Sequence, residues 1–445
     1  MSEAPQKSIE IEIPIGTTQF EGKPMRYRTP NNLTEWRVDT LFLEEPDTVR
    51  WLSCMEPGEV LIDIGANVGM YSTLAAIGRG MRVFAFEPES QNYSLLNQNI
   101  YLNDVADKVT AFCGALSDTD GLSTLHLAHM DAGGAFHASG ESLDFNLEPM
   151  RSSFAQGCVL MTLDRLVEQG TVPMPDHIKL DVDGFEHKVV NGMMNTIKNP
   201  KVKSVAIELN PTLAEHRQVF SQMAELGFSY FDNQRAESCL EEGPFKDIGN
   251  VIFYRPSWPA YEALYQCQIG PMRVEKSISE MAEKIEQTPP LDSATDHFIV
   301  EDIFPAEFYQ NLLNNLPSEE LYKSEQGKTL KVFNLDETDI NRLPGSEMPF
   351  WSQLNYELNS VGFLSKIATA FEGKLTQSDS NNLKLSASIV RGAELELSQM
   401  VEKPLISLCF SLDGDNRLLA YSQSSGVSNI EKLSSKQVLV CSITV

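Results

Sequence analysis

The stretch EVLIDIGANVGMYS, residues 59–72, restricts the possible folds of this chain more than any other segment. An apolar run ends near Asp63, the chain turns through Gly65 and Gly69, and an apolar pattern with helical spacing follows. Glycine allows tight turns and close approach of other backbone segments. A buried strand, a glycine turn and a helix N-terminus in this order predict the first unit of an open α/β sheet, in which ligands bind at the carboxyl ends of the strands.

Short apolar runs alternate with helical patterns throughout the segment that follows. The expected strands are Glu59–Ile64, Met81–Phe86, Val109–Cys113, His177–Leu180, Val202–Glu208 and Asn250–Tyr254. The expected helices are Tyr71–Ile77, Ser90–Leu102, Phe185–Met194 and Leu213–Leu226. Alternation of this kind predicts an α/β fold with a mostly parallel sheet and helices on both faces.

The spacing of the glycine turn indicates which nucleotide the sheet binds. Dinucleotide sites use G-x-G-x-x-G and place a pyrophosphate on the helix N-terminus, whereas this turn reads D-x-G-x-N-x-G. The carboxylate of Asp63 disfavours an anion and suits the cationic methionine part of S-adenosylmethionine. The next strand ends at Glu87, about 20 residues further on, where an acid accepts both hydroxyls of a ribose. The turn therefore predicts S-adenosylmethionine and argues against a hydride-transferring dinucleotide enzyme.

Several motifs in a fixed order extend this pattern. They are the lead-in RTPNNLTEWRVDTLFLEEPDTVRWL, the turn DIGANVG, FAFEPE, GALSD at 114–118, TLDRLV at 162–167, IKLDVDGFEHKVVNG at 178–192 and AIELN at 206–210. With these motifs, residues from about 25 to 254 resemble the FkbM family of S-adenosylmethionine-dependent methyltransferases. The resemblance implies a Rossmann-like class I methyltransferase fold with a mostly parallel seven-stranded sheet.

The resemblance also implies an activity and a cofactor site. Family members usually methylate a hydroxyl on a sugar, a polyketide or another natural product, so we expect a small-molecule acceptor. Methylation of an amide or amine nitrogen, and a cofactor-binding scaffold without turnover, remain as alternatives. The residues expected to line the cofactor are Asp63, Gly65, Asn67, Gly69 and Glu87, with Ser117 and Asp118 beside the adenine.

Acidic residues follow the fourth and fifth expected strands of this unit. In strand geometry Lys179, Asp181 and Asp183 point to one face, near the carboxyl end of their strand. An alcohol must lose its proton during methyl transfer, and a carboxylate with a raised pKa can accept that proton. We predict Asp181 as the general base, with Lys179 orienting it or stabilising a developing alkoxide. Asp183 is assigned to acceptor binding, together with Glu208 and Asn210 at the end of the adjacent strand.

These residues also suit other roles. A divalent metal held by Asp181, Asp183 or Glu208 is possible but not favoured, and Asp183 also suits a helix cap. The glycine-rich stretch HMDAGGAFHASGESLDFNLEPMRSSFAQG, residues 129–157, is expected to form a flexible loop over the acceptor. In it, His137 is a second candidate catalytic base. The two histidines of H-x-x-H at 126 and 129 are not expected to bind metal, and His187 is expected on a helix surface.

Composition limits the partners and the compartment. The formal net charge of −27 repels phosphate backbones and anionic lipids, so we expect neither nucleic acid nor a membrane as a partner. The seven cysteines form no CxxC motif and their number is odd, which is typical of reduced thiols in the cytoplasm. No apolar stretch approaches the roughly 18 residues that span a bilayer. The N-terminal segment lacks the apolar core of a signal peptide.

The 445 residues allow two or three domains. We expect an N-terminal lead-in at 1–58 that packs on the methyltransferase domain, the methyltransferase domain itself at 59–255, a helical linker at 256–295 and a second, smaller α+β or β-rich domain at 296–445. The expected elements after residue 255 are helices at 272–285 and 308–316 and strands at 383–390, 405–412, 417–421 and 437–445.

The C-terminal region resembles 2-oxoglutarate/iron oxygenase domains. The similar segments are DHFIVEDIFPAEFYQNLLNNL at 296–316 and LSASIVRGAELELSQMVEKPLISLCFSLDGD at 385–415. That family binds iron with two histidines and one carboxylate. The first ligand pair would fall near Ser398 to Met400, and the chain has no histidine after His297. We therefore expect a degenerate domain without oxidative chemistry, which binds substrate, a protein partner or a second copy of the chain. An unpaired edge strand of its sheet would favour such association.

Overall fold

The computed structural model describes residues 13–240, 242–266, 270, 272–288, 297–324, 331–370, 384–391, 406–412, 417–422 and 437–444. The chain forms two compact units. The first takes in the described parts of Met1–Glu44, Met55–Tyr230 and Leu240–Trp258, and the second those of Glu45–Cys54, Phe231–Cys239 and Pro259–Val445. Among the described residues, none of the helices combines the length and apolar character needed to cross a membrane.

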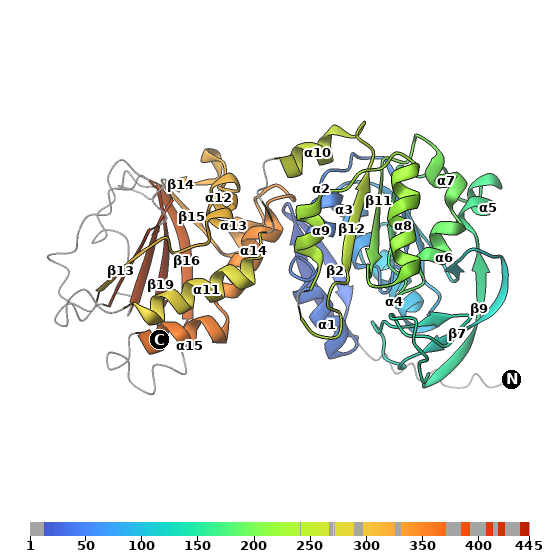
Figure 1. Cartoon of the computed structure of the whole chain (residues 1–445), viewed down its shortest axis with the longest axis horizontal. Coiled ribbons are helices and arrows are strands. Elements are labelled where there is room, and N and C mark those ends of the chain that lie inside the picture. Colours follow the sequence, from blue (N-terminus) through green and yellow to red (C-terminus); the bar gives the residue numbers. More distant parts are fainter. Residues whose placement is uncertain are drawn as a thin grey trace, which may run out of the picture. The chain divides into compact units, whose positions relative to one another are not determined.

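The first unit is built on a six-stranded sheet (Figure 1). Its strands, in spatial order, are β12 (Gly249–Tyr254), β11 (Ser204–Leu209), β10 (His177–Leu180), β3 (Val60–Ile64), β4 (Arg82–Phe86) and β5 (Val109–Phe112). All neighbours pair in parallel except β11 and β12, which confirms the expected mostly parallel α/β fold. The expectation of seven strands is wrong for the described residues, because the chain leaves this sheet after β5 and forms a separate one.

The strand order reverses between β3 and β10, which places a topological switch point there. The chain runs from β3 outward to β5, then returns and runs from β10 outward to β12. In an open α/β sheet the crevice at such a point, beyond the carboxyl ends of the strands, is where ligands bind. The glycine turn after β3 and the acidic segment after β10 both open on this crevice.

Helices connect the strands of the first unit. They are α1 (Asn32–Asp39), α3 (Met70–Gly78), α4 (Ser90–Leu102), α5 (Leu163–Glu168), α6 (Glu186–Asn191), α7 (Met194–Lys198) and α8 (Ala214–Glu225). The apolar side chains of the sheet and helices form one buried cluster, to which Ile62, Ile178 and Ile207 contribute from three neighbouring strands. This core fixes the strand ends and therefore the residues that follow them.

The described residues before Glu44 belong to the first unit and begin with two strands. Strands β1 (Ile15–Phe20) and β2 (Lys23–Arg28) form a hairpin. The hydroxyl of Tyr27 donates to the carbonyl of Met70, 3.2 Å away, and the amide of Arg28 donates to Asn99 Oδ1 at 2.8 Å. The hairpin thereby stabilises the helix that starts at the glycine turn.

A second, four-stranded sheet carries the stretch that was expected to be a loop. It consists of β6 (Ala115–Leu116), β9 (Phe154–Met161), β7 (Gly121–Leu127) and β8 (Ala138–Ser139), in that order. The stretch expected to be irregular, 129–157, therefore contains the short strand β8 and ends in the first residues of β9, and the expectation holds for the rest of it. Strands β6 and β8 could not be predicted from the sequence, because each has only two residues.

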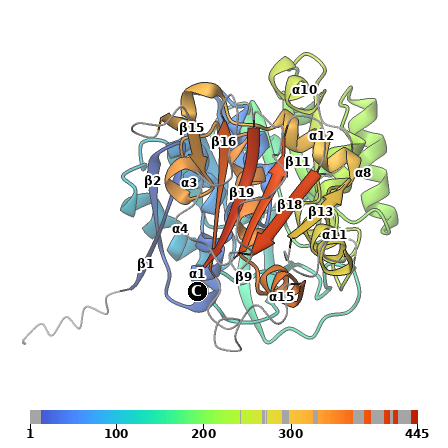
Figure 2. The same cartoon turned by 90° about the vertical axis from the view of Figure 1, so that its left-hand side faces the viewer.

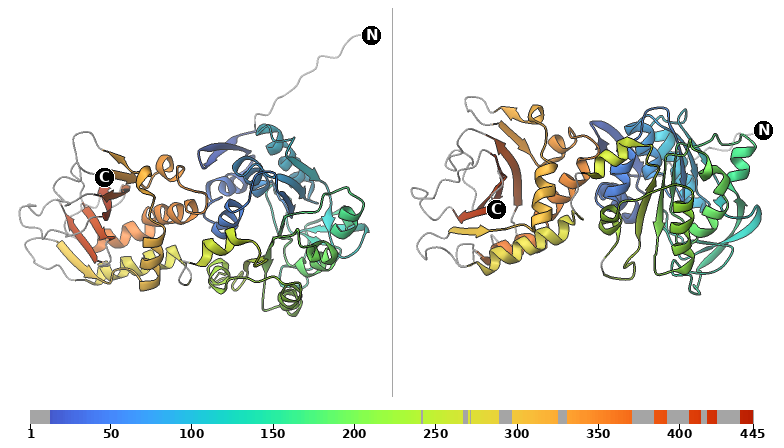
Figure 3. Two further views of the ribbon diagram at one scale, coloured as in Figure 1. Left: turned by 90° about the horizontal axis from the view of Figure 1, so that it is seen from above. Right: turned by 45° about the horizontal axis from the view of Figure 1, so that its top comes forward.

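The second unit contains a seven-stranded sheet in which all described neighbours are antiparallel (Figure 2). Its strands, in spatial order, are β13 (His297–Glu301), β18 (Arg417–Ser422), β17 (Ile406–Ser411), β19 (Gln437–Thr444), β16 (Lys384–Arg391), β15 (Lys331–Asn334) and β14 (Lys323–Ser324). Figure 3 shows the helices of this unit gathered on one side of the sheet. The arrangement is of the α+β type.

The helices of the second unit come from three parts of the chain. They are α2 (Pro46–Ser53), α9 (Asp232–Ser238), α10 (Pro259–Gln266), α11 (Val274–Gln287), α12 (Ala306–Asn314), α13 (Glu337–Ile340), α14 (Met348–Leu358) and α15 (Val361–Ala370), with a short 3-10 turn at Glu319–Leu321. Helices α11 and α12 and strands β16 to β19 lie close to their expected positions. The positions expected for iron ligands, Ser398 to Met400, lie outside the described residues.

Candidate active site

The glycine turn after β3 is closely packed by the chain itself. Gly65 has a φ of +82°, and a Cβ built on it would lie 1.7 Å from the carbonyl oxygen of Asp181. Gly69, also at +82°, begins α3, and its Cβ would lie 2.4 Å from Leu96 Cδ1. Both glycines are thus required by local packing as well as by any ligand. The close approach at Gly65 places the turn directly against the backbone that follows β10.

Two buried acids lie at the turn, as the sequence predicts. Asp63 accepts a hydrogen bond from the hydroxyl of Ser72 at 2.5 Å. Glu87, directly after β4, accepts from the amides of Asn67 at 2.8 Å and Glu89 at 2.7 Å. Burial raises the pKa of Glu87 to about 8. The carboxyl group of Asp63 therefore comes from β3, and that of Glu87 from the residue directly after the neighbouring strand β4.

The segment 130–137 is fastened over the turn by asparagine side chains. The carbonyl of Gly134 accepts from Asn67 Nδ2 at 2.8 Å and from Asn92 Nδ2 at 3.0 Å, and the amide of Gly133 donates to Asn92 Oδ1 at 2.7 Å. Arg37 Nε adds a hydrogen bond to the carbonyl of Gly133 at 2.8 Å. The stretch expected to be a flexible loop is thus held by several specific contacts. Asn92 was missed by sequence reasoning, because its partners lie about 40 residues away in the chain.

Asp183 faces this segment and not the side of Lys179 and Asp181. Strand β10 ends at Leu180, and Asp183 has a φ of +56°, so strand alternation does not extend to it. Its carboxylate accepts from the amides of Phe136 at 2.7 Å and His137 at 3.3 Å. Burial, and then the charge of Asp181, raise the pKa of Asp183 to about 7. The expectation of one shared face for the three side chains is therefore wrong for Asp183.

Asp181 lies beside the turn with a partly exposed carboxylate. Lys179 Nζ donates to Asp181 Oδ2 at 2.9 Å, and the side chain of Asp181 is 25% exposed while that of Lys179 is buried. The ammonium group of Lys179 also lies 5.0 Å from the ring centre of Tyr71 on α3. The lysine holds the carboxylate at the strand end, as expected.

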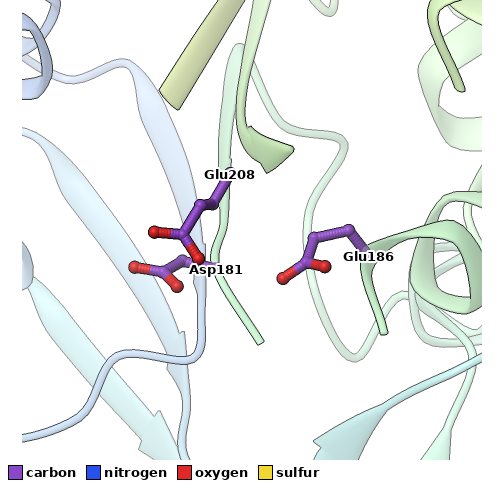
Figure 4. Close-up of side chains that lie close together, drawn as sticks. All are labelled: Asp181, Glu186 and Glu208. Atoms are coloured by element: carbon purple, nitrogen blue, oxygen red, sulfur yellow. The ribbon is translucent and has the colours of Figure 1, made fainter. Parts of the chain in front are cut away.

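Three carboxylates gather at this strand end, and we call Asp181, Glu186 and Glu208 the acid cluster (Figure 4). One oxygen of each lies within 4.8 Å of the others. Burial raises the pKa of Glu186 to about 8, and the charge of Asp181 acts in the same direction. The sequence places Glu186 in this motif but gives no reason to assign it a role.

The acid cluster fits a divalent metal poorly. Hard cations need several free carboxylate oxygens. Glu186 already accepts from the amides of Val182 at 2.8 Å and Gly184 at 3.0 Å, and His216 Nε2 lies 3.4 Å from it. The carboxylate oxygens of Glu186 thus already accept hydrogen bonds from the turn between β10 and α6.

The remaining predicted residues lie on both sides of the switch point. Asn210 follows β11, and its Nδ2 donates to Asn146 Oδ1 at 3.2 Å. Ser117 follows β6, is buried and donates to Asp118 Oδ1 at 3.2 Å. The carbonyl oxygen of Ser117 lies 1.9 Å from a Cβ built on Gly192, so this end of β6 packs on the end of α6. A position beside the adenine remains a prediction for Ser117 and Asp118.

The histidines of the first unit differ in their surroundings. Both ring nitrogens of His137 are buried and have no hydrogen-bond partner among the described residues, and burial lowers its pKa to about 4. His137 is therefore neutral near pH 7. His129 Nδ1 lies 3.2 Å from Asp131, and His126 lies within β7.

Comparisons with known proteins identify the family of the first unit. The family described as "Methyltransferase FkbM domain" matches residues 63–230, which lie in the first unit. The hexuronic acid methyltransferase AglP of Haloferax volcanii is 30% identical over 193 residues, covering 43% of this chain and 73% of that protein. The 31-O-demethyl-FK506 methyltransferase FkbM of Streptomyces tacrolimicus is 24% identical over 202 residues, covering 40% of this chain and 76% of that protein.

A solved structure with a weaker likeness is that of magnesium protoporphyrin IX methyltransferase from Synechocystis PCC 6803 with bound S-adenosylmethionine. It is 12% identical, has a TM-score of 0.30 and covers 51% of this chain and 85% of that chain. A TM-score this low adds no support to the family assignment from the sequence matches. The match to the family and the identity to AglP show that the chain belongs to the FkbM methyltransferases, enzymes whose methyl donor is S-adenosylmethionine.

Proposed function

We propose that this enzyme transfers the methyl group of S-adenosylmethionine to a hydroxyl oxygen of a small-molecule acceptor at the switch point between β3 and β10. The observation that carries the proposal is Asp181. Its backbone adjoins the glycine turn at Gly65, and its partly exposed carboxylate is held by Lys179. A base is thus positioned beside the cofactor turn. The name of one relative, a 31-O-demethyl-FK506 methyltransferase, also specifies an oxygen acceptor.

Residues on both sides of the glycine turn after β3 hold the cofactor in this proposal. The carboxylate of Asp63 suits the ammonium group of the methionine part, and Glu87 suits the two ribose hydroxyls. Asn67 links Glu87 to the segment 130–137, because its amide donates to Glu87 and its side chain donates to Gly134. Ser117 and Asp118 are assigned to the adenine. The cofactor residues therefore come from β3, β4 and the segment after β5.

The chain's own residues supply positioning and proton transfer. S-adenosylmethionine, when bound, supplies an electrophilic methyl group on a sulfonium. Transfer requires the acceptor oxygen in line with the bond that breaks, and most of the rate gain comes from holding that geometry in a site without water. Asp181 takes the hydroxyl proton as the oxygen–methyl bond forms. Lys179 keeps the carboxylate of Asp181 oriented, while Glu208, Asn210 and Asp183 line the acceptor side.

His137 is a second base within the same proposal. Its ring nitrogens are buried without a described partner, and its backbone amide is fixed by Asp183. A neutral imidazole accepts a proton, although a pKa of about 4 makes it a weak base. We therefore assign proton removal to Asp181 and a hydrogen bond to the acceptor to His137.

The variant Asp181→Asn tests the proposal. It preserves size and removes the base, so we expect unchanged binding of S-adenosylhomocysteine and a loss of turnover on the order of 10²-fold or more. Turnover is the transfer of labelled methyl from S-adenosylmethionine to low-molecular-weight compounds of a cell extract. The matched control is Asp107→Asn at an exposed position, which should leave transfer unchanged.

The same labelled product identifies the acceptor atom. With a carbon-13 methyl donor, the chemical shift of the transferred methyl separates a methoxy group from an N-methyl group. An N-methyl product would contradict the hydroxyl acceptor but not methyl transfer. Transfer by Asp181→Asn at the wild-type rate would remove Asp181 from the mechanism.

For the second unit we propose a role without oxidation. Its antiparallel sheet with helices on one side is compatible with a degenerate oxygenase-like domain, and the sequence after His297 offers no histidine for iron. The expected division into a lead-in at 1–58, a methyltransferase domain at 59–255, a linker at 256–295 and a C-terminal domain stays part of this proposal. Contact with a protein partner or a second copy of the chain is the role that remains for the C-terminal domain.

A further inference from the structure

His216 joins the ends of two central strands of the first unit. It lies in the first turn of α8, its side chain is buried, and each ring nitrogen contacts the main chain of a different segment. The amide of Asn210, the residue after β11, donates to Nδ1 at 3.0 Å. Nε2 lies 3.0 Å from the carbonyl oxygen of Gly184, in the turn after β10. One imidazole ring therefore links the two segments that follow β10 and β11.

These two contacts fix the tautomer of the His216 ring. A backbone amide can only donate, so Nδ1 carries no proton and accepts the hydrogen bond from Asn210. A carbonyl oxygen can only accept, so Nε2 carries the proton and donates to Gly184. A second proton, on Nδ1, would place two donors against each other. Burial lowers the pKa of His216, which also favours the uncharged ring. The ring is therefore a neutral and oriented bridge near pH 7.

On the side of β10, His216 restrains the turn that begins with Asp181. The amides of Val182 and Gly184 in this turn donate to the carboxyl group of Glu186, at 2.8 and 3.0 Å. An oxygen of the same carboxyl group lies 3.4 Å from His216 Nε2. His216 and Glu186 thus hold the main chain directly after Asp181, one through a carbonyl group and the other through two amides.

On the side of β11, His216 restrains the main chain two residues beyond Glu208. The parallel register of β10 and β11, continued by one residue, places Asp181 beside Glu208. Their carboxylates come within 4.8 Å of each other (Figure 4). The spacing of these two acids depends on the strand ends that carry them. His216 connects the strand ends through Gly184 on one side and Asn210 on the other.

We infer that His216 is a positioning residue for methyl transfer, because its ring holds the segments after β10 and β11 together and thereby sets the position of Asp181 relative to Glu208. It acts through the main chain, since both ring nitrogens are used by backbone groups. A displacement of a reacting group by about 1 Å costs on the order of 10²-fold in rate. The inference rests on the proposed function, because it concerns how the base of that reaction is held.

Three variants of the full-length enzyme separate the two hydrogen bonds. His216→Phe keeps a ring and removes both bonds. His216→Gln places an amide donor near the position of Nε2 and keeps the bond to Gly184, whereas His216→Asn places an acceptor near the position of Nδ1 and keeps the bond to Asn210.

The readouts are transfer of labelled methyl at saturating S-adenosylmethionine and the affinity for S-adenosylhomocysteine. We expect His216→Phe to lower transfer by about 10- to 100-fold, and His216→Gln and His216→Asn to lower it by about 3- to 10-fold. The affinity for S-adenosylhomocysteine should stay within about twofold of wild type in all three, because the glycine turn and its acids are unchanged. A loss of rate without a loss of cofactor affinity separates positioning from general destabilisation.

His177→Phe is the matched control, because His177 is another buried histidine that joins β10 to β11. Its Nδ1 lies 2.7 Å from Ser204 Oγ and its Nε2 lies 3.0 Å from Glu59 Oε2. These contacts are at the amino ends of the strands, at the opposite edge of the sheet from the glycine turn. His177→Phe should lower the stability toward denaturant, as His216→Phe does, and leave methyl transfer unchanged.

The tautomer of His216 gives an independent readout. Nitrogen-15 NMR of the full-length protein labelled at histidine distinguishes protonated from unprotonated ring nitrogens, and the signals that are absent from His216→Gln belong to His216. We expect a protonated Nε2 and an unprotonated Nδ1 at pH 7. The opposite tautomer, or a doubly protonated ring, would overturn the inference.

The outcomes of the transfer assays are equally distinct. Wild-type transfer by His216→Phe, or an equal loss in His177→Phe, overturns the inference. If His216→Phe does not fold, the other two variants decide, and wild-type transfer by both of them overturns it. Absence of S-adenosylhomocysteine binding by wild type contradicts the proposed function itself. Methyl transfer by wild type and at the same rate by the His216 variants overturns the inference alone.

Discussion

The positions of individual side chains could be predicted where they depend on residues nearby in the sequence. Asp63, Glu87 and Asp181 end strands whose apolar pattern is clear, so the sequence places them at one sheet edge. Asp183 was misjudged, because a left-handed backbone conformation redirects its side chain toward Phe136. Such a reversal depends on contacts with a distant segment and leaves no pattern in the local sequence.

The buried acids of the first unit predict how stability changes with pH. Burial raises the pKa of Glu186 from 4.5 to about 8, so the folded state binds one proton more than the unfolded state between these values. Stability therefore falls as pH rises through this range, by about 1.4 kcal/mol per pH unit for one such group. Glu87 and Asp183 act in the same direction.

We expect Glu186→Gln to flatten this dependence. Unfolding free energies from denaturant titrations at several pH values between 4.5 and about 8 give the slope. The exposed Glu168→Gln serves as the matched control and should keep the wild-type slope. A slope unchanged by Glu186→Gln would show that this carboxyl group does not carry the extra proton.

The central elements were predictable because parallel strands are long apolar runs between clear turns. Helix Ser90–Leu102 and strand His177–Leu180 have the bounds expected from the sequence. The four-stranded sheet was not predicted, because its strands β7 and β9 are partly exposed and depend on pairing with each other. The segment 130–137 was predicted only as a loop, because the side chains that hydrogen-bond to it, Asn67 and Asn92, lie far away in the sequence.

Asn92 should hold the segment 130–137 in its observed conformation. It is buried on α4 and bonds to both Gly133 and Gly134, so Asn92→Ala leaves two backbone groups without these partners at a cost of about 1–3 kcal/mol. We expect faster hydrogen–deuterium exchange at 130–137 and lower methyl transfer. Asn97→Ala removes an exposed amide on the same helix and should alter neither. Equal exchange in both variants would contradict the role of Asn92.

The whole molecule combines a methyltransferase unit with a unit of different architecture. The sequence changes from alternating α/β patterns to β-like runs, and the domain boundaries expected from this change stay a prediction. Helices α13, α14 and α15 were not expected, because polar residues interrupt the apolar pattern of the side chains that these helices bury in the second unit. The helix α2 was also assigned to the lead-in, although it belongs to the second unit.

The second unit should not consume 2-oxoglutarate. Iron binding in the resembled family needs two histidines, and the chain has none after His297. We therefore expect no succinate above background when the full-length protein is incubated with iron(II), ascorbate and 2-oxoglutarate. Iron-dependent succinate production would contradict the assignment of a degenerate domain.

The central claim is that the glycine turn and its acids hold the methyl donor. Calorimetric titration of the full-length protein with S-adenosylhomocysteine tests it most directly, on wild type, on Glu87→Ala and on the exposed control Glu168→Ala. The account predicts binding by wild type and by Glu168→Ala, and a loss of at least about tenfold in affinity for Glu87→Ala. Wild-type affinity in Glu87→Ala, or no binding by wild type, would contradict it.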